Sequence, residues 1–171
     1  MSQNLVLTPA GRSSYYWKTN NTNNEHDNSM TKKYSVNPYL FFNGRCEEAI
    51  EFYRKVTGAE LLMSMRYKDA PPEAKPPGCG TTISENAIMH ARININGSTV
   101  LLSDGPCSGK FDGFALSLTA PNPDEAQKVF AALGEGGKVN MPLNKTFFSP
   151  AFGMLQDKFG VGWMVYVEQA S

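Results

Sequence analysis

The chain has 171 residues, and its 16 Lys and Arg balance 16 Asp and Glu, so the formal net charge is zero. That length is typical of one domain, and a nucleic-acid-binding protein needs a basic excess that is missing here. No apolar run approaches the roughly 18 residues of a membrane-spanning helix. The sequence therefore predicts a protein whose partners are neither nucleic acids nor membranes.

The first 33 residues differ from the rest of the chain. Residues 18–28 are polar and rich in asparagine, which is typical of disordered chain. The N-terminus lacks the basic and apolar stretches of a secretory signal, and the three cysteines suggest no disulfide framework. We expect a disordered leader over 1–33, with Met30 as an alternative native start, a folded domain over 34–171 and a cytoplasmic location.

The folded part opens with a strand, a helix and three more strands. The helix repeats apolar residues at helical spacing and ends at Gly58. Asn96-Gly97 is a strong hairpin signal between the last two strands, and a proline-rich loop precedes that hairpin. The predicted elements are residues 39–42, 46–56, 60–67, 87–95 and 98–103.

The same order then repeats. Asn122 or Pro123 opens the second helix, and glycines from Gly134 to Gly137 end it. The predicted elements are residues 114–119, 123–133, 138–143, 152–156 and 163–168. Two βαβββ halves, about 34–104 and 112–168, predict an α+β fold in which two modules form a cupped mixed sheet with a ligand cleft between them.

Several motifs resemble one known family. The motifs are Pro38–Tyr53, Ile88–Ile93, Leu101–Asp104, Gly113–Leu118, Gly137–Leu143 and Phe152–Met164. In order along the domain, they resemble the PhnB-like branch of the vicinal oxygen chelate (glyoxalase/bleomycin resistance/dioxygenase) superfamily. The resemblance covers residues 34 to about 168. It implies the glyoxalase/bleomycin resistance-like fold and a homodimer.

Members of this family sometimes carry a 3-demethylubiquinone methyltransferase label. A methyl-donor nucleotide needs a strand, a glycine-rich loop and a helix in that order. The glycines at 134–137 follow a helix instead of opening one. The sequence therefore argues against methyl transfer.

Metal-dependent members of the superfamily use His, Gln and Glu ligands on strands that line the cleft. The resemblance places the corresponding positions at or near Pro38, His90, Phe114 and Met164. Only His90 can ligate, whereas a metal site needs three or more ligands. We therefore predict no metal site and no cofactor.

His90 leaves three interpretations open: a metal ligand, a general base or hydrogen-bond partner for a polar substrate, and a structural histidine. Strand alternation puts Arg92 on the same face, where it can hold an anionic group or be simply solvated or salt-bridged. Phe147 and Trp163 are candidates for an apolar cleft wall, although core packing is the favoured interpretation of these aromatic residues. Asp104 and Asp157 lie at turns that match between the halves, which suits turn-shaping hydrogen bonds.

These residues define the functional hypotheses. We expect a small-molecule-binding protein or a metal-independent enzyme acting on a small anionic metabolite, with His90 as the candidate catalytic residue. Arg92, Phe147 and Trp163 are the candidate ligand-binding residues. The alternatives are a sequestration protein of the antibiotic-resistance type, a metal-dependent lyase or isomerase with unrecognised ligands, and a module that has lost its site. The sequence leaves open whether the protein is an enzyme.

Overall fold

The computed structural model describes residues 34–71, 83–105 and 110–169. Among these residues, those from Val36 onward form one compact unit. The predicted leader and most of the proline-rich loop lie outside the described residues. Within the described part, no helix is long and apolar enough to cross a membrane.

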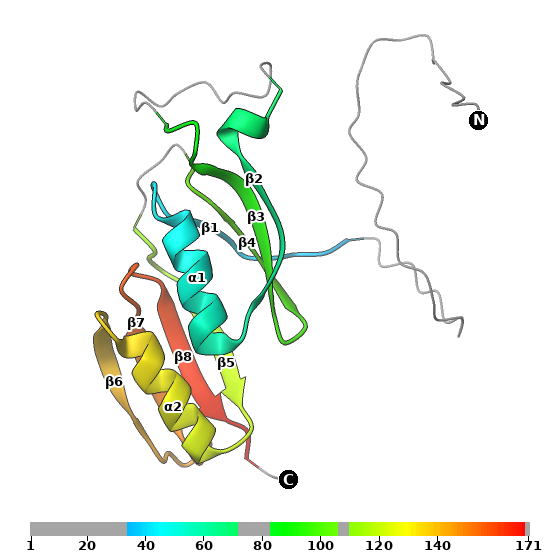
Figure 1. Cartoon of the computed structure of the whole chain (residues 1–171). Helices are drawn as coiled ribbons and strands as arrows, with labels where there is room; N and C mark the ends of the chain where they lie inside the picture. Colours follow the sequence, from blue (N-terminus) through cyan, green and yellow to red (C-terminus); the bar gives the residue numbers. More distant parts are fainter. Residues whose placement is uncertain (1–33, 72–82, 106–109, 170–171) are drawn as a thin grey trace, which may run out of the picture. The chain divides into compact units, whose positions relative to one another are not determined.

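The first module contains one helix and a four-stranded sheet, sheet A (Figure 1). Its strands are arranged in the order β1-β4-β3-β2, with β1 parallel to β4 and the other pairs antiparallel. The elements are β1 (Tyr39–Phe41), α1 (Cys46–Thr57), β2 (Glu60–Arg66), the short 3₁₀ helix η1 (Tyr67–Asp69), β3 (Ile88–Ile95) and β4 (Ser98–Ser103).

The second module repeats this arrangement in sheet B. Its strand order, β5-β8-β7-β6, corresponds strand for strand to that of sheet A, with β5 parallel to β8. The elements are β5 (Leu116–Ala120), α2 (Pro123–Gly134), β6 (Lys138–Asn144), β7 (Phe152–Gln156) and β8 (Gly162–Val167). The duplicated βαβββ organisation is thus confirmed, and each module forms its own mixed sheet.

The first helix, α1, forms where apolar residues recur on one face. Cys46, Ala49, Ile50 and Tyr53 are buried against sheet A, and two glutamates occupy the first turn, where the helix dipole favours negative charge. Gly58 ends the helix in the left-handed conformation, at φ 71°, and donates its N–H to a carbonyl of the last turn.

The second helix, α2, begins with a side-chain cap. The Oδ1 atom of Asn122 accepts a hydrogen bond of 2.9 Å from the backbone N–H of Glu125. Pro123 follows in the first turn, where its missing N–H costs nothing. The helix ends at Gly134, and Gly136 has a φ of 70°. As predicted, this glycine cluster terminates a helix.

Strand β6 lies at the edge of sheet B and is irregular. Its pairing with β7 shifts register twice, on either side of Met141. Pro142 lies in the second irregular stretch and has no N–H to donate to a neighbouring strand. This outer edge is therefore bent and incompletely able to pair.

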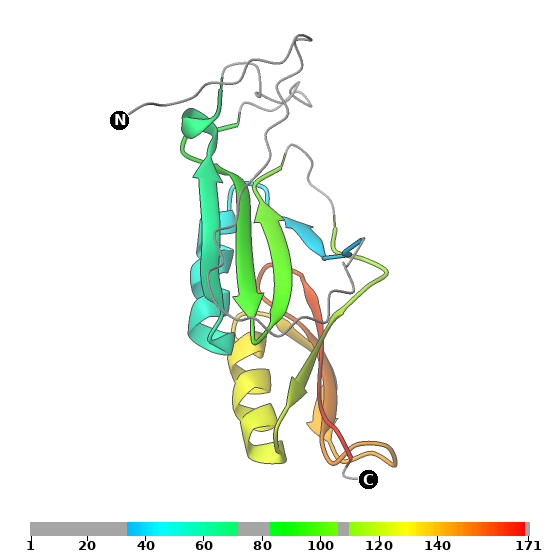
Figure 2. The same cartoon turned by 90° about the vertical axis from the view of Figure 1, so that its right-hand side faces the viewer.

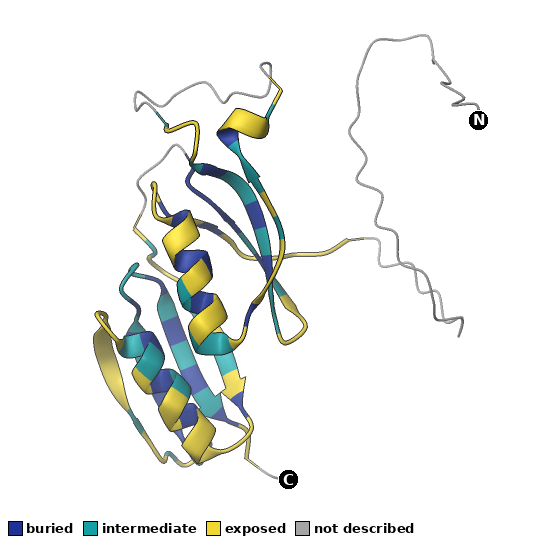
Figure 3. Cartoon of the chain, in the orientation of Figure 1, coloured by how far each residue is buried: buried dark blue, intermediate teal, exposed yellow. Residues whose placement is uncertain are grey.

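Each helix covers one face of its own sheet (Figures 1 and 2). The buried residues form one core cluster that extends through both modules, and the inward faces of both helices contribute to it (Figure 3). The modules meet through aromatic side chains: Phe42 and Tyr53 of the first module contact Phe159, and Tyr53 contacts Trp163. The opposite face of each sheet carries the more exposed side chains.

Candidate functional site

The face of sheet A turned away from α1 carries the candidate polar residues. In β3, Ala91 and Ile93 are fully buried beneath the helix, so the alternating pattern turns His90 and Arg92 to the other face. We call this surface the open face of sheet A. By register, Met65 lies beside His90, Met63 and Leu101 lie beside Arg92, and Tyr39 lies beside Leu101.

His90 is held by a tyrosine from the neighbouring part of the sheet. The Tyr39 hydroxyl lies 3.0 Å from His90 Nδ1, and the two rings are 5.6 Å apart. Tyr39 in turn stacks on Phe41, with 4.8 Å between ring centroids. Burial, assisted by the positive charge of Arg92, lowers the pKa of His90 below its ordinary value of 6.5. The imidazole is therefore neutral at physiological pH.

Arg92 has an unsatisfied donor. Its Nε atom is buried and makes no hydrogen bond within the part of the chain that the structure describes. The salt bridges among those residues do not include Arg92 either. A buried donor without a partner is costly, and a guanidinium matches carboxylate and phosphonate oxygens. The open face of sheet A is therefore suited to an oxyanion.

The two candidate aromatic residues lie elsewhere. Trp163 is only 2% exposed, in the core, where its Nε1–H donates to Asp157. Trp163 is nevertheless among the residues that line a groove between the two modules, so it stays a candidate for the wall of that groove and not for the open face of sheet A. Phe147, by contrast, is 94% exposed in the β6–β7 connection of the second module and contacts Phe148. The structure thus brings His90 and Arg92 together but does not join either aromatic residue to them.

The sequence alone did not indicate that Tyr39 belongs to the site around His90. It lies 51 residues from His90 in the chain, and the contact depends on β1 pairing with β4 and β4 with β3. Strand alternation puts Tyr39 and Phe41 on one face, opposite Leu40, but it does not indicate which β3 residues share that face.

The predicted cleft between the modules is present as a groove of about 840 Å³. Residues 94–100 of the β3–β4 hairpin and residues 116–121 around β5 line much of it. His90, Arg92 and Phe147 are not among its lining residues. The candidate polar site thus lies on one module and outside this groove.

The residues present do not fit a metal site of the superfamily type. Of the four positions that the resemblance indicates, Pro38, Phe114 and Met164 offer neither an imidazole nor a carboxylate, and only His90 remains. No group of three or more His, Cys, Asp or Glu residues is placed to hold a metal ion within residues 34–71, 83–105 and 110–169.

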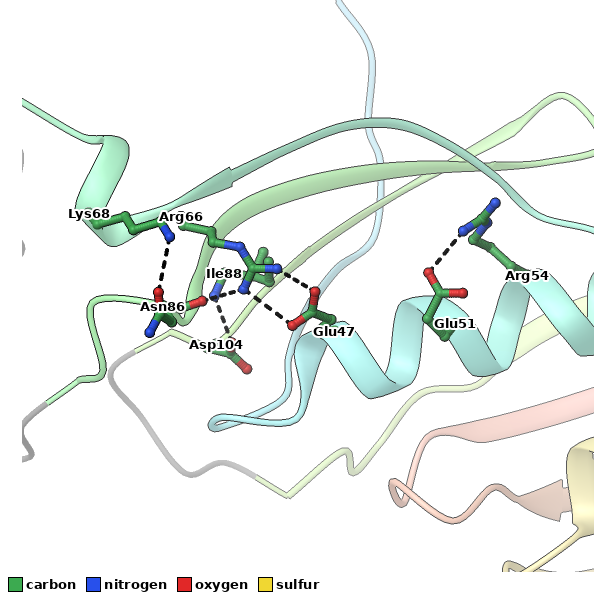
Figure 4. Close-up of polar contacts among 8 residues, drawn as sticks. All are labelled: Glu47, Glu51, Arg54, Arg66, Lys68, Asn86, Ile88 and Asp104. Atoms are coloured by element: carbon green, nitrogen blue, oxygen red, sulfur yellow. Dashed lines mark hydrogen bonds and ion pairs between the residues drawn. The ribbon is translucent and has the colours of Figure 1, made fainter.

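Asp104 is a buried structural carboxylate at the start of α1. Its two oxygens accept backbone N–H bonds from Cys46 at 2.7 Å and from Ile88 at 2.8 Å. Beside it, Arg66 forms an ion pair with Glu47 (Figure 4). With its oxygens committed to the backbone, Asp104 connects α1 to β3.

Asp157 has a comparable role inside the molecule. One carboxylate oxygen accepts from the Tyr53 hydroxyl at 2.8 Å and from Trp163 Nε1 at 3.0 Å. The other accepts from two backbone N–H groups of the following turn, so the expected turn-shaping role is confirmed. Asp157 follows β7 whereas Asp104 follows β4, so the prediction that they lie at matching turns was wrong.

Known proteins resemble this chain over most of its length. Residues 34–166 match the family described as 3-demethylubiquinone-9 3-methyltransferase. Protein YjdN of Escherichia coli K12 is 37% identical over an alignment of 138 residues that covers 77% of this chain and 94% of that protein.

Solved structures also resemble this chain over most of its length. Protein PA1353 from Pseudomonas aeruginosa is 35% identical, with a TM-score of 0.70, and the match covers 81% of this chain and all of that one. The PhnB protein from Bacillus cereus is 29% identical, with a TM-score of 0.64, over 78% of this chain and 99% of that one.

A more distant structure supports the fold alone. A glyoxylase/bleomycin resistance protein/dioxygenase domain from Frankia is 14% identical, with a TM-score of 0.55, over 81% of this chain and 94% of that one. Together with the duplicated βαβββ modules, these matches identify the family and the fold of the chain. The chain belongs to the family described as 3-demethylubiquinone-9 3-methyltransferase, a name that the PhnB protein from Bacillus cereus also carries, and it has the fold of glyoxylase/bleomycin resistance proteins.

Proposed function

We propose that the protein binds a small anionic metabolite on the open face of sheet A, as a small-molecule-binding protein or as a metal-independent enzyme. The observation that carries this proposal is the buried, unpartnered Nε of Arg92, next to a neutral His90. An oxyanion would be held by the guanidinium charge, and a small shift of the atoms that cover Nε would let it supply the missing acceptor. His90 is placed to take part through a hydrogen bond or a proton transfer.

The surroundings of Arg92 suit the carbon skeleton of such a metabolite. Tyr39 and Phe41 are 38% and 46% exposed, respectively, and their stacked rings adjoin the polar pair. Met63 lies beside Arg92 on the neighbouring strand, and thioether side chains adapt to ligands of varied shape. A few polar groups in a mostly apolar surface are typical of small-molecule sites.

The direct test is calorimetric titration of the full chain with simple carboxylates and phosphonates, such as benzoate and methylphosphonate. We expect Arg92→Met to weaken binding by about ten-fold or more, because charge-assisted hydrogen bonds are lost. The matched control is Arg54→Met, which removes the same charge from an exposed ion pair on α1. Equal affinities of the wild type and Arg92→Met would show that the anion site is wrongly placed.

Binding alone does not separate sequestration from catalysis. Each anion that binds is therefore incubated with the protein and followed by proton NMR. An unchanged spectrum supports sequestration, and a new product supports an enzyme. The homodimer and the cytoplasmic location stay predictions. Light scattering of the purified protein tests the homodimer.

A further inference from the structure

The hydrogen bond between Tyr39 and His90 restricts the chemistry of the imidazole. Neutral histidine has one N–H and one acceptor nitrogen, and the bond made by one nitrogen decides which of them carries the proton. His90 Nδ1 lies 3.0 Å from the Tyr39 hydroxyl. The direction of this single bond therefore decides which nitrogen of the neutral ring carries the proton.

The bond has a preferred direction. A phenol hydroxyl is a good donor, with a reference pKa near ~10, whereas its oxygen is a weaker acceptor than the lone pair of a neutral imidazole nitrogen. In this direction Tyr39 O–H would donate to Nδ1, and the proton of the neutral ring would reside on Nε2.

The neighbours of His90 also favour the neutral ring. Tyr39 on β1 is the titratable group in contact with it, and Arg92 on β3 adds a positive charge. Met65 on β2 pairs with it and carries no charge. No carboxylate contributes to the shift of its pKa. No acidic group described around the ring thus stabilises an imidazolium.

We propose that Tyr39 is a positioning residue that fixes His90 as the Nε2–H tautomer, so that His90 acts on a bound anion as a neutral hydrogen-bond donor and not as a base. The role toward a ligand rests on the proposed function. The tautomer, in contrast, is a property of the protein without ligand.

This assignment narrows the class of ligand. Arg92 has only N–H donors, and His90 adds a further donor at Nε2, so the polar part of the face offers donors without a free base. Such a face recognises a group that is already deprotonated at neutral pH, such as a carboxylate or phosphonate. It does not favour a substrate whose proton His90 would have to remove.

The tautomer can be measured by long-range ¹⁵N–¹H NMR on the ¹⁵N-labelled full chain. The chain has only two histidines, His26 and His90, so His26→Gln assigns the spectrum. We expect a protonated Nε2 and an acceptor Nδ1 for His90, and a mixture of tautomers in Tyr39→Phe. A protonated Nδ1 in the wild type, or the same spectrum in Tyr39→Phe, would overturn the proposal. Tyr166→Phe, also on a sheet, is the control.

The same samples give the pKa of His90 when the spectra are recorded as a function of pH. Arg92→Met should raise the pKa of His90, because a neighbouring positive charge is lost.

A pair of substitutions tests the donor role with benzoate and methylphosphonate as probes. Glutamine at position 90 retains an N–H donor but cannot act as a base, so His90→Gln should bind close to the wild type. His90→Ala should bind about ten-fold more weakly. Equal losses in both variants would contradict the donor role. If neither probe binds the wild type, the proposed function fails for these anions, while the NMR result still decides the tautomer.

Discussion

At the scale of single residues, some buried polar groups have all their hydrogen-bonding atoms paired, whereas others keep an unpaired donor. Asp157 uses both carboxylate oxygens for bonds inside the core, and burial with this neighbour raises the pKa of Tyr53. Arg92 has a buried donor with no described partner. Unused hydrogen-bonding capacity, more than residue type, distinguishes the candidate site from the structural carboxylates.

The Tyr53–Asp157 bond gives a prediction on stability. Tyr53→Phe removes a buried donor to a carboxylate and leaves the ring in place, so we expect a loss of about 1–3 kcal/mol in unfolding free energy. Urea denaturation measures it. Tyr166→Phe is the control, because Tyr166 is less buried and has no such bond to a buried carboxylate. Equal stability of the two variants would mean that the bond contributes nothing net.

At the scale of elements, local sequence signals predicted most helices and strands. Gly58, Asn96-Gly97 and Asn122 act within a few residues of their own position, and the elements they delimit are present. The strand predicted at 114–119 is displaced to Leu116–Ala120, since strand ends depend on the partner, here β8. Local signals carry no information about that partner.

The packing of α2 on sheet B depends on a glycine in β7. A methyl group at Gly153 would lie 2.7 Å from Phe130 Cε2 and 2.9 Å from the backbone of Leu143. We expect Gly153→Ala to lower the unfolding free energy by about 1–3 kcal/mol through overpacking. Thermal and urea unfolding of the variant check this value.

Gly134→Ala serves as the comparison. Its added methyl group would meet side chains at ordinary contact distances, 3.8 Å and longer, at the end of a helix. Alanine there should be neutral or slightly stabilising. A Gly153→Ala variant as stable as Gly134→Ala would show that Phe130 and the β6 backbone move aside at no cost.

At the scale of the whole folded unit, the two modules share one core. Phe42 and Tyr53 pack on side chains of the second module, and the buried cluster is continuous. The sequence predicted two modules but not the residues that join them. Tyr53 and Asp157 lie 104 residues apart. From the sequence, Tyr53 is recognisable only as an apolar position of a helix and Asp157 only as a turn residue. For the same reason the sequence did not indicate that the first module contributes to the burial of Trp163.

A shared core predicts that the modules unfold together. In the Trp17→Phe variant, Trp163 is the only tryptophan, so its fluorescence reports on the junction between modules, while circular dichroism reports on both helices. We expect the two urea transitions to coincide, as in two-state unfolding. A fluorescence transition that precedes the loss of helix would indicate modules that separate before they unfold.

The irregular edge of sheet B has a consequence for the protein in concentrated solution. A straight outer strand with free N–H and C=O groups can template another chain and begin aggregation. Strand β6 shifts register twice and includes Pro142, so an incoming strand would meet a bend and a missing donor. These irregularities of β6 thereby protect one margin of the described sheet against amyloid-like growth.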